Sequence, residues 1–175
     1  RTVDAPGAER LRRATEAFGR SGTNALAVVK ALVDDYPEVP IFYEWLGDQF
    51  GQARDAMSAC NAYAKASELG YNMIYAYRQQ AKFHQIIGNI PVAIDKAETA
   101  FLLNPSDSLV RHELAQLLTN VGAALLARKE FQSAAECLNR AAWLEPKSRE
   151  TMMQLARLQL ETGQTNNAIG ILDGV

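Results

Sequence analysis

The sequence predicts an all-α protein, an α-solenoid of about five helix-turn-helix repeats. Alanines stand at a nearly constant interval, since Ala25, Ala59, Ala93, Ala134 and Ala168 are separated by 34, 34, 41 and 34 residues. Apolar residues around these alanines recur every three or four positions, which is the spacing of one helix face. A proline or a glycine closes each of the first four repeats, as is typical where a helix stops. A period of about 20–50 residues built from helix pairs indicates stacked repeats that bury a continuous core.

The fourth repeat carries the clearest pattern. Its first helix has the apolar stripe Leu118, Val121, Gly122 and Leu125, its second has Ala134, Leu138 and Ala141, and Pro146 closes it. This pattern resembles the tetratricopeptide repeat, W-x2-L-G-x2-Y, then A-x3-F, then P, over about 34 residues. The resemblance covers nearly the whole chain. It implies a right-handed superhelix of helix pairs whose concave surface, lined by the first helix of each pair, binds another protein.

The five repeats are expected at about 9–39, 40–73, 74–107, 108–148 and 149–175, after a linker or frayed start over residues 1–8. The first opens with a weak helix over Glu9–Phe18, because Arg12 and Arg13 take the Leu-Gly positions. The third departs from the pattern at Gln80, which takes an apolar position, while His84 takes an aromatic position as a core histidine. The fifth stops before its last turn. We therefore expect that the chain is a fragment, or that its end packs against another molecule.

The fourth repeat is seven residues longer than the others. The extra residues, 108–114, contain no proline or glycine, and seven residues make about two turns of helix. We therefore expect a lengthened first helix from about Asp107 to Arg128, whose apolar face is continued by Leu114 and Leu117. Whether this insert has a function of its own stays open.

Composition argues against several function classes. The chain has 175 residues, 48% of them hydrophobic, and a formal net charge of −2 without a basic stripe, so we expect no nucleic-acid partner. No apolar run approaches the ~20 residues of a membrane helix, so we expect no membrane partner. Cys60 and Cys137 are expected to be small, partly buried thiols. His112-Glu113 begins a near match to H-E-x-x-H, but Gln116 replaces the second ligand. We expect no metal, no cofactor and no catalysis within this chain.

The candidate binding residues are the exposed positions of the first helices, which lie off the core stripe at spacings of three or four. They are Ile41, Glu44 and Asp48 in the second repeat, Tyr75, Arg78, Lys82 and Gln85 in the third, Thr119 and Ala123 in the fourth, and Met153 and Arg157 in the fifth. An acidic pair is thus followed, in equivalent positions of the next repeat, by a basic pair. This order predicts a groove for an extended or helical peptide of matching charge.

An alternative is that the charges pair with each other, Glu44 with Arg78 and Asp48 with Lys82, as exposed neighbours that contribute only ~0–1 kcal/mol each. A subclass of the resembled family clamps a terminal carboxylate with lysine and asparagine side chains. We do not expect that clamp here, because acidic or apolar residues and Thr119 stand at the positions that would need basic or amide groups.

The expected function is a protein–protein interaction scaffold that binds a peptide or protein segment. Two alternatives stay open. The chain could be a docking or regulatory segment of a larger enzyme, such as a glycosyl- or sulfotransferase, or it could self-associate through its open repeat ends. We expect a cytoplasmic location, with the periplasm or another compartment as the alternative. No motif names the partner.

Overall fold

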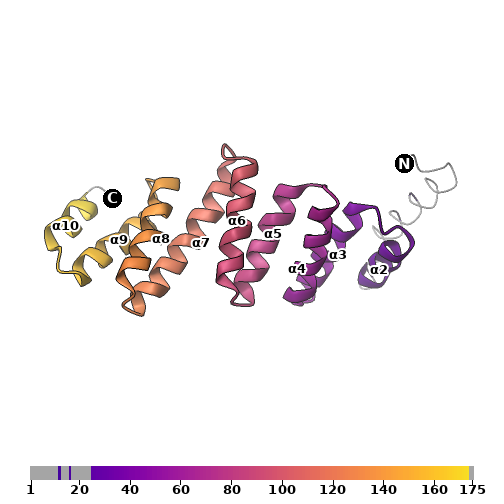
Figure 1. Ribbon diagram of the computed structural model, residues 1–175, viewed down its shortest axis with the longest axis horizontal. Helices are drawn as coiled ribbons and strands as arrows, with labels where there is room; N and C mark the ends of the chain where they lie inside the picture. Colours follow the sequence, from indigo (N-terminus) through magenta and orange to yellow (C-terminus); the bar gives the residue numbers. More distant parts are fainter. Residues whose placement is uncertain (1–11, 13–15, 17–24, 174–175) are drawn as a thin grey trace. The chain divides into compact units, whose positions relative to one another are not determined.

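The computed structural model of the protein describes residues 12, 16 and 25–173 (Figure 1). The linker expected over residues 1–8 and most of the helix expected over Glu9–Phe18 lie outside them. Within the described residues every regular element is an α-helix and none is a strand. The helices are α2 (Ala25–Asp35), α3 (Pro40–Gln52), α4 (Ala56–Glu68), α5 (Met73–Ile86), α6 (Ile90–Leu103), α7 (Ser108–Ala127), α8 (Phe131–Leu144), α9 (Arg149–Glu161) and α10 (Thr165–Asp173).

The chain divides into two compact units, Arg1–Asn89 and Ile90–Val175, each with its own core. The N-terminal unit contains α2 to α5, and the C-terminal unit contains α6 to α10. The boundary falls between α5 and α6, inside the interval predicted as the third repeat. The division of the chain into five repeats therefore stays a prediction.

The core of the N-terminal unit is built around Tyr63 of α4. Helix α4 packs against both α3 and α5, and small residues such as Ala59 and Ala66 let the helices approach closely. The ring of Tyr63 is fully buried and stacks on Phe83 of α5, with ring centroids 5.9 Å apart. A Cβ atom on Gly47 of α3 would lie 2.7 Å from that ring, so this position has room only for glycine.

Gln80, the polar residue in an apolar position, is buried with its amide satisfied. Its Nε2 donates to the carbonyl oxygen of Tyr63 at 3.3 Å and to Oγ of Ser67 at 3.2 Å, both on α4. A buried amide costs little once it is hydrogen-bonded, which explains why the helix tolerates it. His84, one turn further along α5, is half-buried.

The C-terminal unit contains the long helix. Helix α7 has 20 residues, whereas α6 and α8 have 14 each and α9 has 13. Asp107 caps it by accepting hydrogen bonds from the backbone N–H groups of Leu109 and Val110. The added turns bury Val110 and Leu114, so the insert extends the apolar face of the helix. On the next turns Gly122 lies against Leu138 of α8, where a Cβ atom would lie 2.7 Å from the leucine side chain.

Four interhelical turns that precede an alanine of the repeating series share one backbone conformation, which the turn at Gly70 also adopts. Arg54, Gly88, Lys129 and Gly163 each have a positive φ, between 60° and 80°, and each stands five residues before an alanine of the repeating series. The residue that follows donates its N–H to a carbonyl five positions back, as Glu130 does to Leu125 at 3.0 Å and Gln164 does to Gln159 at 2.7 Å. This is the Schellman arrangement, which favours glycine at the left-handed position.

Candidate functional site

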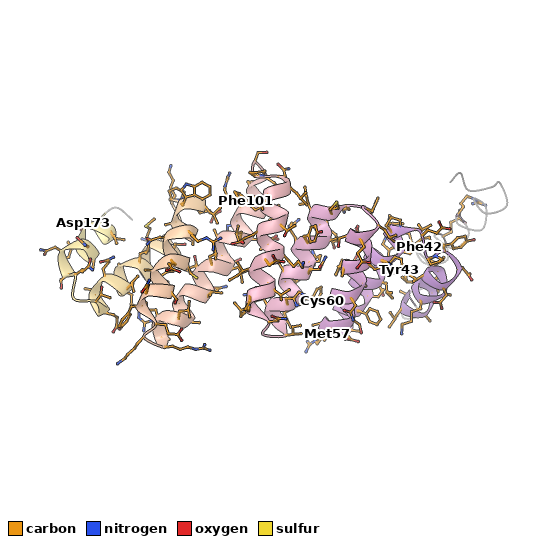
Figure 2. All side chains as sticks on the ribbon, in the orientation of Figure 1. Phe42, Tyr43, Met57, Cys60, Phe101 and Asp173 are labelled. Carbon is orange, nitrogen blue, oxygen red and sulfur yellow. The ribbon has the colours of Figure 1, made fainter. Side chains whose placement is uncertain are left out.

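A groove of about 730 Å³ opens between α3 and α5 in the N-terminal unit. Helix α4 forms the floor of this groove, because the ring of Tyr63 lies among the lining residues of α3 and α5. The lining residues are Trp45, Asp48, Gln49, Gly51 and Gln52 of α3, Tyr63 of α4, and Tyr75, Gln79, Lys82, Phe83 and Ile86 of α5. Figure 2 shows the side chains on these helices, with Phe42 and Tyr43 labelled on α3 and Met57 and Cys60 on α4.

The carboxylate of Asp48 connects all three helices of the groove. It accepts hydrogen bonds from the hydroxyl of Tyr63 at 2.5 Å and from the hydroxyl of Tyr75 at 3.0 Å. The two tyrosine rings also meet edge to face, 5.9 Å apart. Burial, and then the hydrogen bond to the Asp48 carboxylate, raise the pKa of both tyrosines. Both hydroxyls therefore remain protonated donors at neutral pH, and the groove is held in one shape.

The two acidic residues beside the groove accept hydrogen bonds from neutral side chains. Glu44 accepts a hydrogen bond from Nδ2 of Asn72 at 3.2 Å, and Asp48 is bonded to the two tyrosines. The ammonium of Lys82 lies over the ring of Phe83, 5.6 Å from its centroid. Burial raises the pKa of Glu44, the hydrogen bond from Asn72 opposes that rise, and the nearby Asp48 charge adds to it. Asp48 is thus bound by two neutral hydroxyls.

The structure places the predicted residues of this unit on and beside the groove. Asp48, Tyr75 and Lys82 line it. Ile41, Glu44 and Arg78 are half-buried and Gln85 is exposed, all outside the lining.

Sequence reasoning missed Trp45, Gln49, Gln79 and Ile86 as lining residues. Most of the lining residues follow a predicted residue by one position in the sequence, which corresponds to a rotation of about 100° around the helix axis. The helical pattern of apolar and polar residues could not reveal this rotation, because Trp45 and Ile86 are large apolar residues of the kind that usually form a core.

In the C-terminal unit, the prediction that Thr119 is an exposed binding residue is wrong. It was expected on an exposed face, but it is only 3% exposed. Its hydroxyl donates to the carbonyl oxygen of Ala115 at 2.9 Å and lies 2.8 Å from Oγ1 of Thr151 on α9. Helices α7 and α9 thus close on each other at this level, and a buried polar pair takes the place of an open surface. Ala123 is half-buried, and Met153 and Arg157 are exposed on α9.

The described residues contain no group of three or more His, Cys, Asp or Glu side chains that could hold a metal ion. Nδ1 of His112 lies 3.0 Å from the carboxylate of Glu145. Cys60 is buried and Cys137 is half-buried, and burial raises the pKa of both thiols. No helix of the described part combines the length and the apolar character that a membrane span requires.

Solved structures share this architecture. YrrB, described as a tetratricopeptide-repeat (TPR) protein with an unusual peptide-binding site, is 15% identical over 94% of this chain and 79% of its own, with a TM-score of 0.63. The chain has the tetratricopeptide-repeat fold. A MamA protein is 16% identical over 91% of this chain and 84% of its own, with a TM-score of 0.66. MamA from Desulfovibrio magneticus RS-1 is 14% identical over 99% of this chain and 94% of its own, with a TM-score of 0.65.

These likenesses confirm the predicted all-α helical-repeat fold. No family model matches the sequence, and no curated protein matches it either.

Proposed function

We propose that this protein is an interaction scaffold that binds an extended segment of a partner protein in the groove between α3 and α5. The observation that supports the proposal is a set of side-chain amides without hydrogen-bond partners among the described residues, placed around the hydrogen-bonded Asp48, Tyr63 and Tyr75. The side-chain amides of Gln49, Gln52 and Gln79 line the groove and form no hydrogen bond with other described residues. Each amide can both donate and accept, as the backbone of an extended peptide requires.

The remaining lining suits side chains of such a segment. Trp45 and the exposed Ile86 offer apolar contact, and Lys82 offers a cation near one end of α5. The hydrogen bonds of Asp48 to Tyr63 and Tyr75 order the floor before any ligand arrives. A site ordered in advance loses less entropy when it binds. The peptide-binding site named for YrrB, which has the same fold, supports this assignment. The proposal gives the described residues no catalytic role.

A displayed library of random peptides, selected on the whole chain, tests the proposal. Selected peptides are then titrated into the wild type, into Gln79→Arg, which fills the groove, and into Gln85→Arg, which adds the same charge and bulk on the same helix outside the lining. We expect Gln79→Arg to weaken binding at least about tenfold and Gln85→Arg to leave it within about twofold. Equal binding by both variants would contradict the proposal.

Self-association is separated from this role in the same preparation. Sedimentation velocity at several concentrations is expected to show a sedimentation coefficient that does not change with concentration. A coefficient that rises with concentration and returns to the monomer value in Gln79→Arg would mean that the groove serves a second copy of the chain.

A further inference from the structure

A second surface lies on the C-terminal unit, where α6 and α8 end. Two hollows of about 810 Å³ and 470 Å³ meet there, and both are lined by Phe101, Trp143 and Leu144. The ring of Trp143 meets Phe101 of α6, labelled in Figure 2, nearly at a right angle, with centroids 6.4 Å apart. The aromatic pair of this surface comes from α6 and α8, and Arg111 and Leu114 of α7 complete the lining of the two hollows. We call it the Trp143 surface.

The apolar exposure of the Trp143 surface is unusual for a folded domain. Trp143 is 73% exposed, and Leu102, which lines the smaller hollow, is 75% exposed. Pro105 and Pro146 border the larger hollow. Neighbouring apolar side chains that face water together mark sites where a partner binds. Tryptophan is among the residues that contribute most to such binding.

The charge of the larger hollow is positive on balance, because Arg111 and Lys147 outnumber Glu145 in its lining. The carboxylate of Glu145 lies 3.0 Å from Nδ1 of His112, and in the smaller hollow Glu98 forms an ion pair with Arg140. Arg111 and Lys147 line the larger hollow, and neither forms an ion pair with another described residue.

Helix stability does not account for both of these cations. Lys147 follows the end of α8, where a positive charge is favourable, but Arg111 stands near the start of α7, where the helix dipole disfavours it.

We propose that the Trp143 surface binds an acidic segment of a partner protein that places an aromatic side chain against Trp143. Carboxylates beside that aromatic residue would meet Arg111 and Lys147. A second copy of this chain is a poorer occupant. Its own acidic aromatic segment, residues 34–38 (DDYPE), has the ring of Tyr36 packed against Phe42 at 6.2 Å.

Fluorescence anisotropy of labelled pentapeptides with the whole chain tests this proposal. The probes are acetyl-Glu-Asp-Phe-Asp-Glu-amide, the same peptide with Ala in place of Phe, and the basic peptide acetyl-Lys-Arg-Phe-Arg-Lys-amide. We expect saturable binding of the acidic phenylalanine peptide, and weaker binding of the other two. Trp143→Ala is expected to weaken that binding by about thirtyfold, which corresponds to a contact of about 2 kcal/mol.

Charge reversal supplies the matched control. The double variant Arg111→Glu with Lys147→Glu is expected to prefer the basic peptide. Arg128→Glu with Arg157→Glu, the same change at exposed positions outside both hollows, keeps the original preference. Gln79→Arg in the other unit also keeps it, so this proposal and the function proposed for the α3/α5 groove can fail separately.

Several results would overturn the proposal. The acidic and basic peptides could bind the wild type equally, or Trp143→Ala could leave binding unchanged. The control pair could also lower binding as much as the Arg111 and Lys147 pair does. A dimer in sedimentation velocity that Trp143→Ala abolishes would assign the surface to a second copy of the chain.

Discussion

At the scale of single residues, the two buried glycines of the first helices are matched to the side chains above them. Gly47 lies under the ring of Tyr63, and Gly122 lies under Leu138. Each pair joins the first helix of a repeat to its second helix at the Leu-Gly position of the sequence pattern. The side chain that fills the space differs, but the need for a missing Cβ atom is the same, because both neighbours are fully buried.

We predict that Gly47→Ala lowers the free energy of unfolding by about 1–3 kcal/mol, because the Tyr63 ring cannot move away. The ring is held by Phe83 on its face and by Asp48 at its hydroxyl. Urea denaturation followed by circular dichroism measures the change. Gly170→Ala in α10 is the control, because no other described part of the chain lies within 4 Å of the added Cβ beyond the adjoining backbone of α10, and it is expected to stabilise by about 0.5–1 kcal/mol. Equal effects of the two substitutions would contradict this account.

At the scale of elements, the turns that link the helices repeat the same backbone conformation, with a residue of positive φ at the same position. The left-handed position is glycine at Gly88 and Gly163 but a basic residue at Arg54 and Lys129. A residue with a side chain is strained in this conformation by about 1–2 kcal/mol. Two of the four turns thus retain strain that glycine would relieve.

Lys129→Gly is therefore expected to raise the free energy of unfolding by about 0.5–1 kcal/mol, since relief of strain exceeds the added entropy of glycine in the unfolded chain. Gly163→Ala, the opposite change at the equivalent position, is expected to lower it by a similar amount. Thermal melting of both variants beside the wild type checks the pair. A destabilised Lys129→Gly would mean that the lysine side chain makes a contact worth more than the strain.

At the scale of the whole molecule, stability depends on tyrosines that must stay protonated. Burial and the carboxylate of Asp48 raise the pKa of Tyr63 and Tyr75 in the folded state. Unfolded tyrosine loses its proton near pH 10. The contribution of these two groups is therefore fully present below about pH 10 and is lost as pH rises further, because the unfolded chain then binds fewer protons than the folded one.

We expect the free energy of unfolding of the wild type to fall steeply above about pH 10. Tyr63→Phe is expected to be less stable at neutral pH and to show a shallower fall, because one raised pKa has been removed. Urea denaturation at pH values from about 8 to 11.5 measures both curves. Parallel curves would show that Tyr63 does not carry this dependence.

The sequence alone determined the helical class and the length of α7, because both follow from the local spacing of apolar and small residues. It did not determine which face of each first helix stays open. Thr119 was expected to be exposed and is buried against Thr151, whereas Trp45 and Ile86 were not predicted as binding residues and line a groove. Helical periodicity defines a stripe within one helix, but burial depends on how closely the next first helix packs. That distance is set by residues about 30 positions away, so only the tertiary structure decided where a partner can bind.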